Sequence, residues 1–130
     1  MPNHHQQAIQ LLHKADQDLL AFAKFRADPD MAVEILGFHA QQAAEKMLKA
    51  VLAERQVRFP YTHYLVDLMA LLKTHDIPFP EALEAMRDLS AFGVEFRYED
   101  LIEETEPFNA EATLMLLAQL RQWAAAIIQP

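Results

Sequence analysis

The sequence predicts an all-α fold, an up-and-down bundle of four long helices with an additional short helix. Apolar residues make up 52% of the chain, there are only two glycines, and the abundant Ala, Leu, Met, Gln and Glu favour helix. Segment 38–52 carries two adjacent apolar rows at three- and four-residue steps: Ala40, Ala43, Met47 and Val51, and Ala44, Leu48 and Leu52. A helix with two such rows needs more than one partner, so this helix is predicted to lie centrally. The 130 residues are expected to form one domain, 1–130.

The first helix is predicted from about residue 5 to 26. Its buried stripe is expected to contain Ile9, Leu12, Leu19 and Ala23, with Ala8, Ala15 and Phe22 alongside. Asp16 falls on that stripe, where an apolar residue is expected. Asp18 is expected to pair with Lys14, one turn earlier.

The second helix is predicted to start at Asp28-Pro29-Asp30 and to continue to about residue 55. Asp28 suits the cap, Pro29 the first helical position and Asp30 the helix dipole. Gly37 interrupts the pattern, and we interpret it as a point of close helix crossing.

The short third helix is predicted from about 63 to 74, with Thr62 as its cap. Pro80 is expected to open the fourth helix. Its apolar stripe is expected at Leu83, Met86, Leu89 and Phe92 or Gly93, then Phe96. Asn109 is predicted to cap the last helix, which runs to the end of the chain on Leu114, Leu117, Leu120 or Arg121, Ala124 and Ile127.

Charge and composition exclude several classes of function. Eleven basic and nineteen acidic residues give a net charge of −8, which disfavours non-specific binding along nucleic acid. A local basic site remains open, because Arg55 and Arg58 are close in sequence. There is no cysteine for thiolate chemistry. With no signal-like N-terminus and no long apolar run, the chain is expected to be soluble and cytoplasmic, without membrane contact.

Sequence motifs for cofactors and metals are missing. Two glycines cannot build a glycine-rich phosphate loop, so no cofactor is expected. The six histidines do not pair at metal-ligand spacing. His39 has no carboxylate one turn away, and His63 has only Asp67. We therefore expect no metal site.

Several segments resemble the HEPN family of small helical bundles. QQAAEKMLKAVL, residues 41–52, is similar to the second-helix signature of that family, and Ala15-x-x-Asp18-Leu19 resembles its first-helix pattern. Thr62-His63-x-Leu65-x-x-Leu68 resembles a third element. Arg97-Tyr98-Glu99 stands where many members carry Arg-Tyr-Pro, with glutamate replacing the proline.

The resemblance bears on ribonuclease activity. Active HEPN ribonucleases carry an arginine followed after four to six residues by a histidine near the start of the last long helix, for phosphate binding and proton transfer. Counting from Arg97, residues 102–104 are Ile, Glu and Glu, so the histidine is missing. The spacing occurs once elsewhere, from Arg58 to His63. The alternative is a ribonuclease toxin component with this displaced pair.

The resemblance favours a binding role. It implies a HEPN protein that binds a nucleotide or a small nucleotidyltransferase partner, as in toxin–antitoxin modules, and that forms a homodimer; a nucleotide or RNA is the implied ligand. Arg97 is a candidate for binding phosphate and Tyr98 for stacking on a base. The other candidate ligand-binding residues are Lys46, Lys49, Gln42 and His63. Two alternatives remain: Arg97 pairs structurally with Glu45 or Glu95, or the chain is a purely structural helical dimer.

Overall fold

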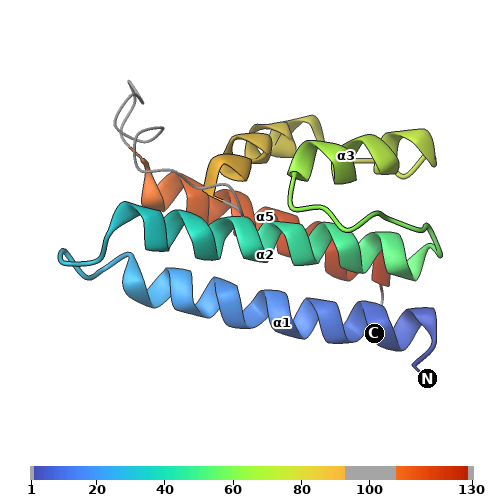
Figure 1. The fold of residues 1–130 in the computed structure, drawn as a ribbon, viewed down its shortest axis with the longest axis horizontal. Coiled ribbons are helices and arrows are strands. Elements are labelled where there is room, and N and C mark those ends of the chain that lie inside the picture. The colour runs from blue at the N-terminus through green and yellow to red at the C-terminus, as the bar shows by residue number, and fades with distance from the viewer. Residues whose placement is uncertain (1, 93–107, 129–130) are drawn as a thin grey trace.

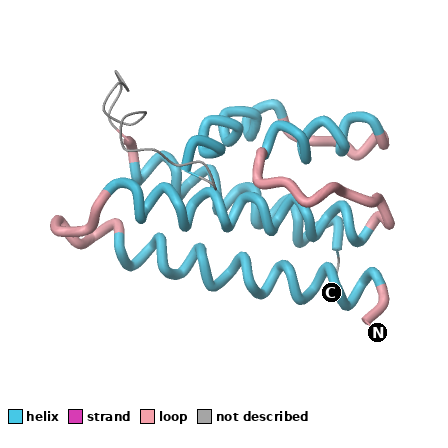
Figure 2. Tube along the Cα trace, viewed as in Figure 1, coloured by secondary structure: helices cyan, strands magenta, loops and turns pink. Residues whose placement is uncertain are grey.

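The computed structural model describes residues 2–92 and 108–128, and every regular element in these ranges is a helix. The elements are α1 (His4–Phe25), α2 (Val33–Glu54), α3 (Leu65–Thr74), the 3-10 helix η1 (Glu81–Phe92) and α5 (Ala110–Ile128). Helices and their connections account for the whole described trace in Figure 2. The predicted all-α bundle, with one short helix between longer ones, is confirmed.

Helix α2 is the centre of the bundle. It packs against α1, α3, η1 and α5, and Figure 1 shows it between α1 on one side and α3 and η1 on the other. All seven members of its two predicted apolar rows are fully buried, and Gly37 is buried within the continuous helix. The need of two apolar rows for several partners explains this central position.

The directions of the helices follow from the connections. Helices α1 and α2 are antiparallel, and α5 runs in the same direction as α2 (Figure 1). Helix α3 also runs in the direction of α2, and the chain returns along the loop before α3 and again along η1. Asn3 begins α1 with a capping box that uses Gln6. Asn109 caps α5 as predicted, since its side chain accepts from the backbone N–H of Ala112.

The predicted start of α2 at Pro29 is wrong. The helix begins at Val33 after Ala32, which makes no side-chain cap. Asp28 instead closes a turn, in which its carboxylate accepts a 2.9 Å hydrogen bond from the backbone N–H of Asp30. An acid before proline serves such a turn as well as it serves a helix cap, so the local pattern fits both.

The start of α3 and the stripe of α1 also differ from the prediction, whereas the predicted stripe of the fourth helix is confirmed at Leu83, Met86 and Leu89. Helix α3 begins at Leu65, and the Thr62 hydroxyl accepts from the backbone N–H of Tyr64 in the turn before it. The fourth element is a 3-10 helix, and its buried residues recur at strict three-residue steps: Leu83, Met86 and Leu89. That spacing matches the three residues per turn of a 3-10 helix. The buried stripe of α1 runs through Ala8, Leu12, Ala15 and Phe22, whereas Ile9 and Leu19 are only partly buried.

The two acids of α1 bind partners on other helices. Asp16 accepts two hydrogen bonds from Arg121 of α5, at 2.6 and 3.0 Å, which explains an acid on an apolar stripe. Asp18 pairs with His39 and Lys46 of α2 rather than with Lys14, so that prediction is wrong. Both contacts tie α1 to neighbouring helices.

Candidate functional site

The segment between α2 and α3, residues 55–64, lies back along α2. After the helix ends, Gln56 takes a left-handed backbone conformation, with φ of 58°. The backbone N–H of Val57 then donates to the Leu52 carbonyl, and the Val57 side chain is buried. Further along, the His63 carbonyl accepts a 2.8 Å hydrogen bond from Gln41 Nε2. The chain therefore returns from the end of α2 to its middle, and Figure 1 shows this path.

Glu45 is the centre of a polar cluster beneath this segment, and its side chain is only 5% exposed. Its Oε1 atom accepts from Gln41 Nε2 at 2.9 Å and from His63 Nδ1 at 2.9 Å. Its Oε2 atom accepts from Lys49 Nζ at 2.9 Å. Both carboxylate oxygens are thus satisfied by donors from α2 and from the segment above it.

The cluster keeps Glu45 ionised. Burial by itself raises the pKa of this carboxyl, but the hydrogen bonds from Gln41, Lys49 and His63 together lower the pKa below its ordinary value of 4.5. An ionised carboxylate can only accept hydrogen bonds, so each neighbour donates to it. Lys49 and Glu45 form a buried ion pair that His63 extends toward the surface.

Aromatic rings cover the lysine of this cluster. Lys49 Nζ lies 5.7 Å from the centre of the Phe59 ring and 6.0 Å from that of Tyr61, within the range of a cation–π contact. The Tyr61 ring meets the His63 ring edge to face at 5.2 Å. Tyr61 is nevertheless 91% exposed, so a large aromatic surface faces solvent beside the histidine.

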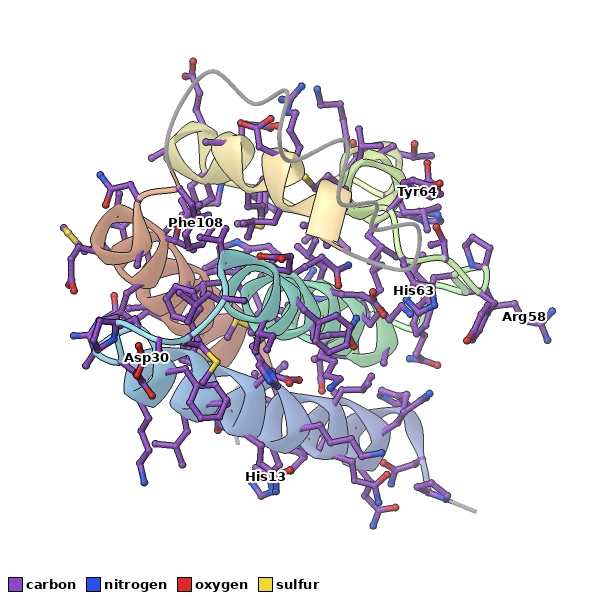
Figure 3. All side chains as sticks on the ribbon, turned by 60° about the vertical axis from the view of Figure 1, so that its left-hand side comes forward. His13, Asp30, Arg58, His63, Tyr64 and Phe108 are labelled. Carbon is purple, nitrogen blue, oxygen red and sulfur yellow. The ribbon has the colours of Figure 1, made fainter. Side chains whose placement is uncertain are left out.

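Two arginines lie between α2 and His63 in the chain. Arg55 and Arg58 are both exposed, and neither pairs with a carboxylate of the described residues. Figure 3 shows Arg58 extending outward on the same side of the molecule as His63. A guanidinium group suits carboxylate and phosphate oxygens, so these two exposed side chains are candidate anion-binding groups in a chain with a net charge of −8.

The structure brings three of the predicted site residues together. Lys49 and His63 both bind Glu45 directly. Gln42 joins them through Gln41, whose Oε1 accepts from Gln42 Nε2 at 2.8 Å. Lys46, one of the other candidates, pairs with Asp18 of α1 instead. Arg97 and Tyr98, together with the alternative pairing of Arg97, lie outside the described residues.

Two histidine environments differ from the prediction. His39 does have a carboxylate partner, because Asp18 of α1 lies 3.0 Å from its Nδ1. His63 binds Glu45 rather than Asp67, and the Asp67 carboxylate accepts from the Thr62 hydroxyl at 3.0 Å. Both partners come from another element, which helical spacing along one segment cannot reveal. Within residues 2–92 and 108–128, no group of three or more His, Asp or Glu side chains could hold a metal ion.

Sequence reasoning missed Glu45 and Gln41 as the core of the site, treating them as the polar flank of α2. One signal was present: residues 43–53 are apolar apart from Glu45, Lys46 and Lys49. Such a helix is buried on most of its surface, and a buried acid must find donors. The lysine four residues after Glu45 supplies one of them.

The comparisons with known proteins fit this helical arrangement. The family model of the HEPN domain matches residues 8–127, nearly the whole chain. The comparison with curated proteins finds no match, and neither does the comparison with solved structures.

The protein belongs to the HEPN domain family. The resemblance of its second helix and the helical bundle are thereby confirmed. Within the described ranges, no helix is both long and apolar enough to cross a bilayer.

Proposed function

We propose that the protein is a HEPN-family binding protein that recognises a nucleoside phosphate through segment 58–63 and the Glu45 cluster beneath it. The observation that carries the proposal is an exposed Arg58, with no ion-pair partner among the residues that the structure describes, on the same segment as an exposed Tyr61 and the half-buried His63. A guanidinium group suits phosphate oxygens, and an aromatic face suits a base. His63 adds a ring nitrogen for hydrogen bonding.

Calorimetric titration with ATP tests this proposal. The wild-type chain is expected to bind ATP, and His63→Ala is expected to weaken binding about tenfold, because one hydrogen bond to a charged group is lost. His13→Ala is the matched control: His13 is exposed on α1, away from His63 (Figure 3). Equal affinities in the two variants would contradict the assignment of His63.

The family resemblance also suggests a second version of this proposal, in which the chain binds a nucleotidyltransferase partner instead of a free nucleotide. The nucleotide is then carried by the partner, and the same segment faces it. Co-elution of the chain with a nucleotidyltransferase encoded beside it, lost in His63→Ala, supports this form. Roles for Lys46, Arg97 and Tyr98 stay predictions, to be tested by the affinity of each alanine variant for ATP.

Ribonuclease activity is the rival from a different class, and one observation favours it. Arg58 has the family's spacing to His63, and a carboxylate holds His63 in place. The two residues would then bind phosphate and transfer a proton. Incubation of labelled RNA without metal, with the wild type and with His63→Ala, separates these two proposals. If no RNA is cleaved, or if His63→Ala cleaves it as well as the wild type, the ribonuclease proposal is excluded.

Homodimer formation is a separate proposal. Large apolar residues are exposed near the start of α2: Val33, Ile35 and Phe38. Such a surface suits pairing with a second copy. Light scattering that finds a stable monomer at high concentration would count against both the homodimer and the purely structural dimer.

A further inference from the structure

Glu45 determines which nitrogen of His63 faces a ligand. The carboxylate is ionised and buried, so it accepts and cannot donate. The hydrogen between Glu45 Oε1 and His63 Nδ1, which are 2.9 Å apart, therefore belongs to the histidine. In the neutral ring this leaves Nε2 without a hydrogen, and in the protonated ring Nε2 carries the second one.

The same carboxylate also fixes the backbone that carries His63. Gln41 Nε2 donates to Glu45 Oε1 and to the carbonyl oxygen of His63, at 2.9 and 2.8 Å. Because the acceptor is a carboxylate, the amide must present its nitrogen to both. Its oxygen is then left for Gln42 Nε2, as observed. Glu45 therefore positions the ring of His63 directly and its main chain through Gln41.

With Nδ1 bound to Glu45, Nε2 is the ring nitrogen of His63 that remains available to a ligand. The His63 side chain is 25% exposed, and no hydrogen bond joins Nε2 to any of the described residues. The exposed Tyr61 ring is in edge contact with the imidazole. The exposed Arg58 comes five residues earlier on the same segment.

We propose that Glu45 is a positioning residue, which fixes the hydrogen of His63 on Nδ1 and so presents Nε2 to a nucleoside phosphate bound at segment 58–63. This inference rests on the proposed nucleotide binding and adds its geometry. In the neutral ring Nε2 accepts from a ligand hydroxyl, and in the protonated ring it donates to a phosphate oxygen. Glu45 itself touches no ligand.

Nitrogen NMR of the imidazole rings tests the first step without any variant. With ¹⁵N-labelled protein at about pH 8, where histidine is ordinarily neutral, His63 is expected to carry its hydrogen on Nδ1. Addition of ATP is expected to shift the resonance of His63 Nε2 far more than that of Nδ1. A hydrogen on Nε2 in the free protein would overturn the inference.

Glu45→Gln tests the second step, because a glutamine amide can offer either oxygen or nitrogen to Nδ1. The fixed tautomer is expected to be lost and the affinity for ATP to fall about tenfold, the loss of one aligned charge-assisted hydrogen bond. Asp18→Asn is the matched control, since it makes the same acid-to-amide change at the carboxylate that binds His39. It is expected to leave the His63 tautomer and the ATP affinity unchanged.

The outcomes separate this inference from the function on which it rests. ATP binding with an undisturbed Nε2 resonance would overturn the role of Glu45 and leave nucleotide binding intact. Glu45→Gln that only lowers the melting temperature, with tautomer and affinity unchanged, would make Glu45 merely structural. Absence of ATP binding by the wild-type chain would overturn both.

Discussion

A buried acid keeps its charge only when enough donors surround it, and Glu45 has three side-chain donors within 2.9 Å. Each donor has a different consequence. Lys49 neutralises the charge, Gln41 connects the acid to the backbone of the segment above, and His63 carries the interaction to the surface. Removing any partner leaves part of a desolvated charge uncompensated, which is costly in a protein interior.

Stability should therefore depend on pH through Glu45. Its pKa is lowered in the folded protein, so the unfolded chain takes up the proton first as the pH falls. The stabilisation by the ionised carboxylate is present above the ordinary value of 4.5 and is lost as the pH falls through the folded pKa. The difference in unfolding free energy between wild type and Glu45→Gln is expected to shrink over that window.

Urea unfolding at a series of pH values measures this difference. Glu81→Gln provides the control, because Glu81 is exposed and the substitution is identical. Its difference from wild type should stay close to zero throughout. A wild-type advantage over Glu45→Gln that persists unchanged in acid would contradict the ionised state of Glu45.

At the scale of elements, helices α2 and α3 end in the same way. Each is followed by a non-glycine residue in the left-handed region, Gln56 with φ of 58° and Asp76 with φ of 57°. The next residue, Val57 or Ile77, then donates back to a helix carbonyl and buries its side chain. This is a Schellman ending, and at α2 it starts the path of the segment that carries Arg58 and His63.

Glycine at position 56 should stabilise the protein. The left-handed conformation costs a residue with a Cβ atom about 1–2 kcal/mol, while glycine loses more chain entropy on folding, so Gln56→Gly is expected to add about 0.5–1 kcal/mol to the unfolding free energy. Gln119→Gly, at an exposed position inside α5, should lower it by about 1 kcal/mol instead. Thermal and urea unfolding measure whether each variant gains or loses stability. A loss of stability in both variants would contradict the strain assigned to Gln56.

The helices also show which features of the fold could be predicted from the sequence. Apolar periodicity predicted the helices and the central place of α2, since burial of both rows leaves no other arrangement. The start of α2 was wrong because Asp28 makes the same kind of hydrogen bond in a turn as in a cap. The predictions for His39 and His63 were wrong because the carboxylates that bind them lie 21 and 18 positions away in the chain. Contacts of that separation depend on how helices pack, which periodicity does not specify.

At the scale of the whole molecule, α2 packs against each of the other described helices. Three alanines lie near the middle of α2, and Ala40, Ala43 and Ala44 are completely buried. Small side chains let neighbouring helices approach closely. Polar contacts then link the outer helices directly: Asp16 binds Arg121 between α1 and α5, and this pairing raises the pKa of the arginine. The bundle is held by one shared central helix with such contacts around it.

A larger side chain at position 44 should therefore destabilise the bundle as a unit. Ala44→Leu adds three carbon atoms where the side chain is fully buried, and overpacking of this kind costs about 1–3 kcal/mol. Ala118→Leu adds the same atoms at an exposed position of α5 and should change stability by less than about 0.5 kcal/mol. Unfolding followed by circular dichroism and by Trp123 fluorescence should give coincident, shifted transitions for Ala44→Leu, since the indole is partly buried against the core and donates to the Pro78 carbonyl. Equal stabilities of the two variants, or separate transitions for the two probes, would contradict a single core organised around α2.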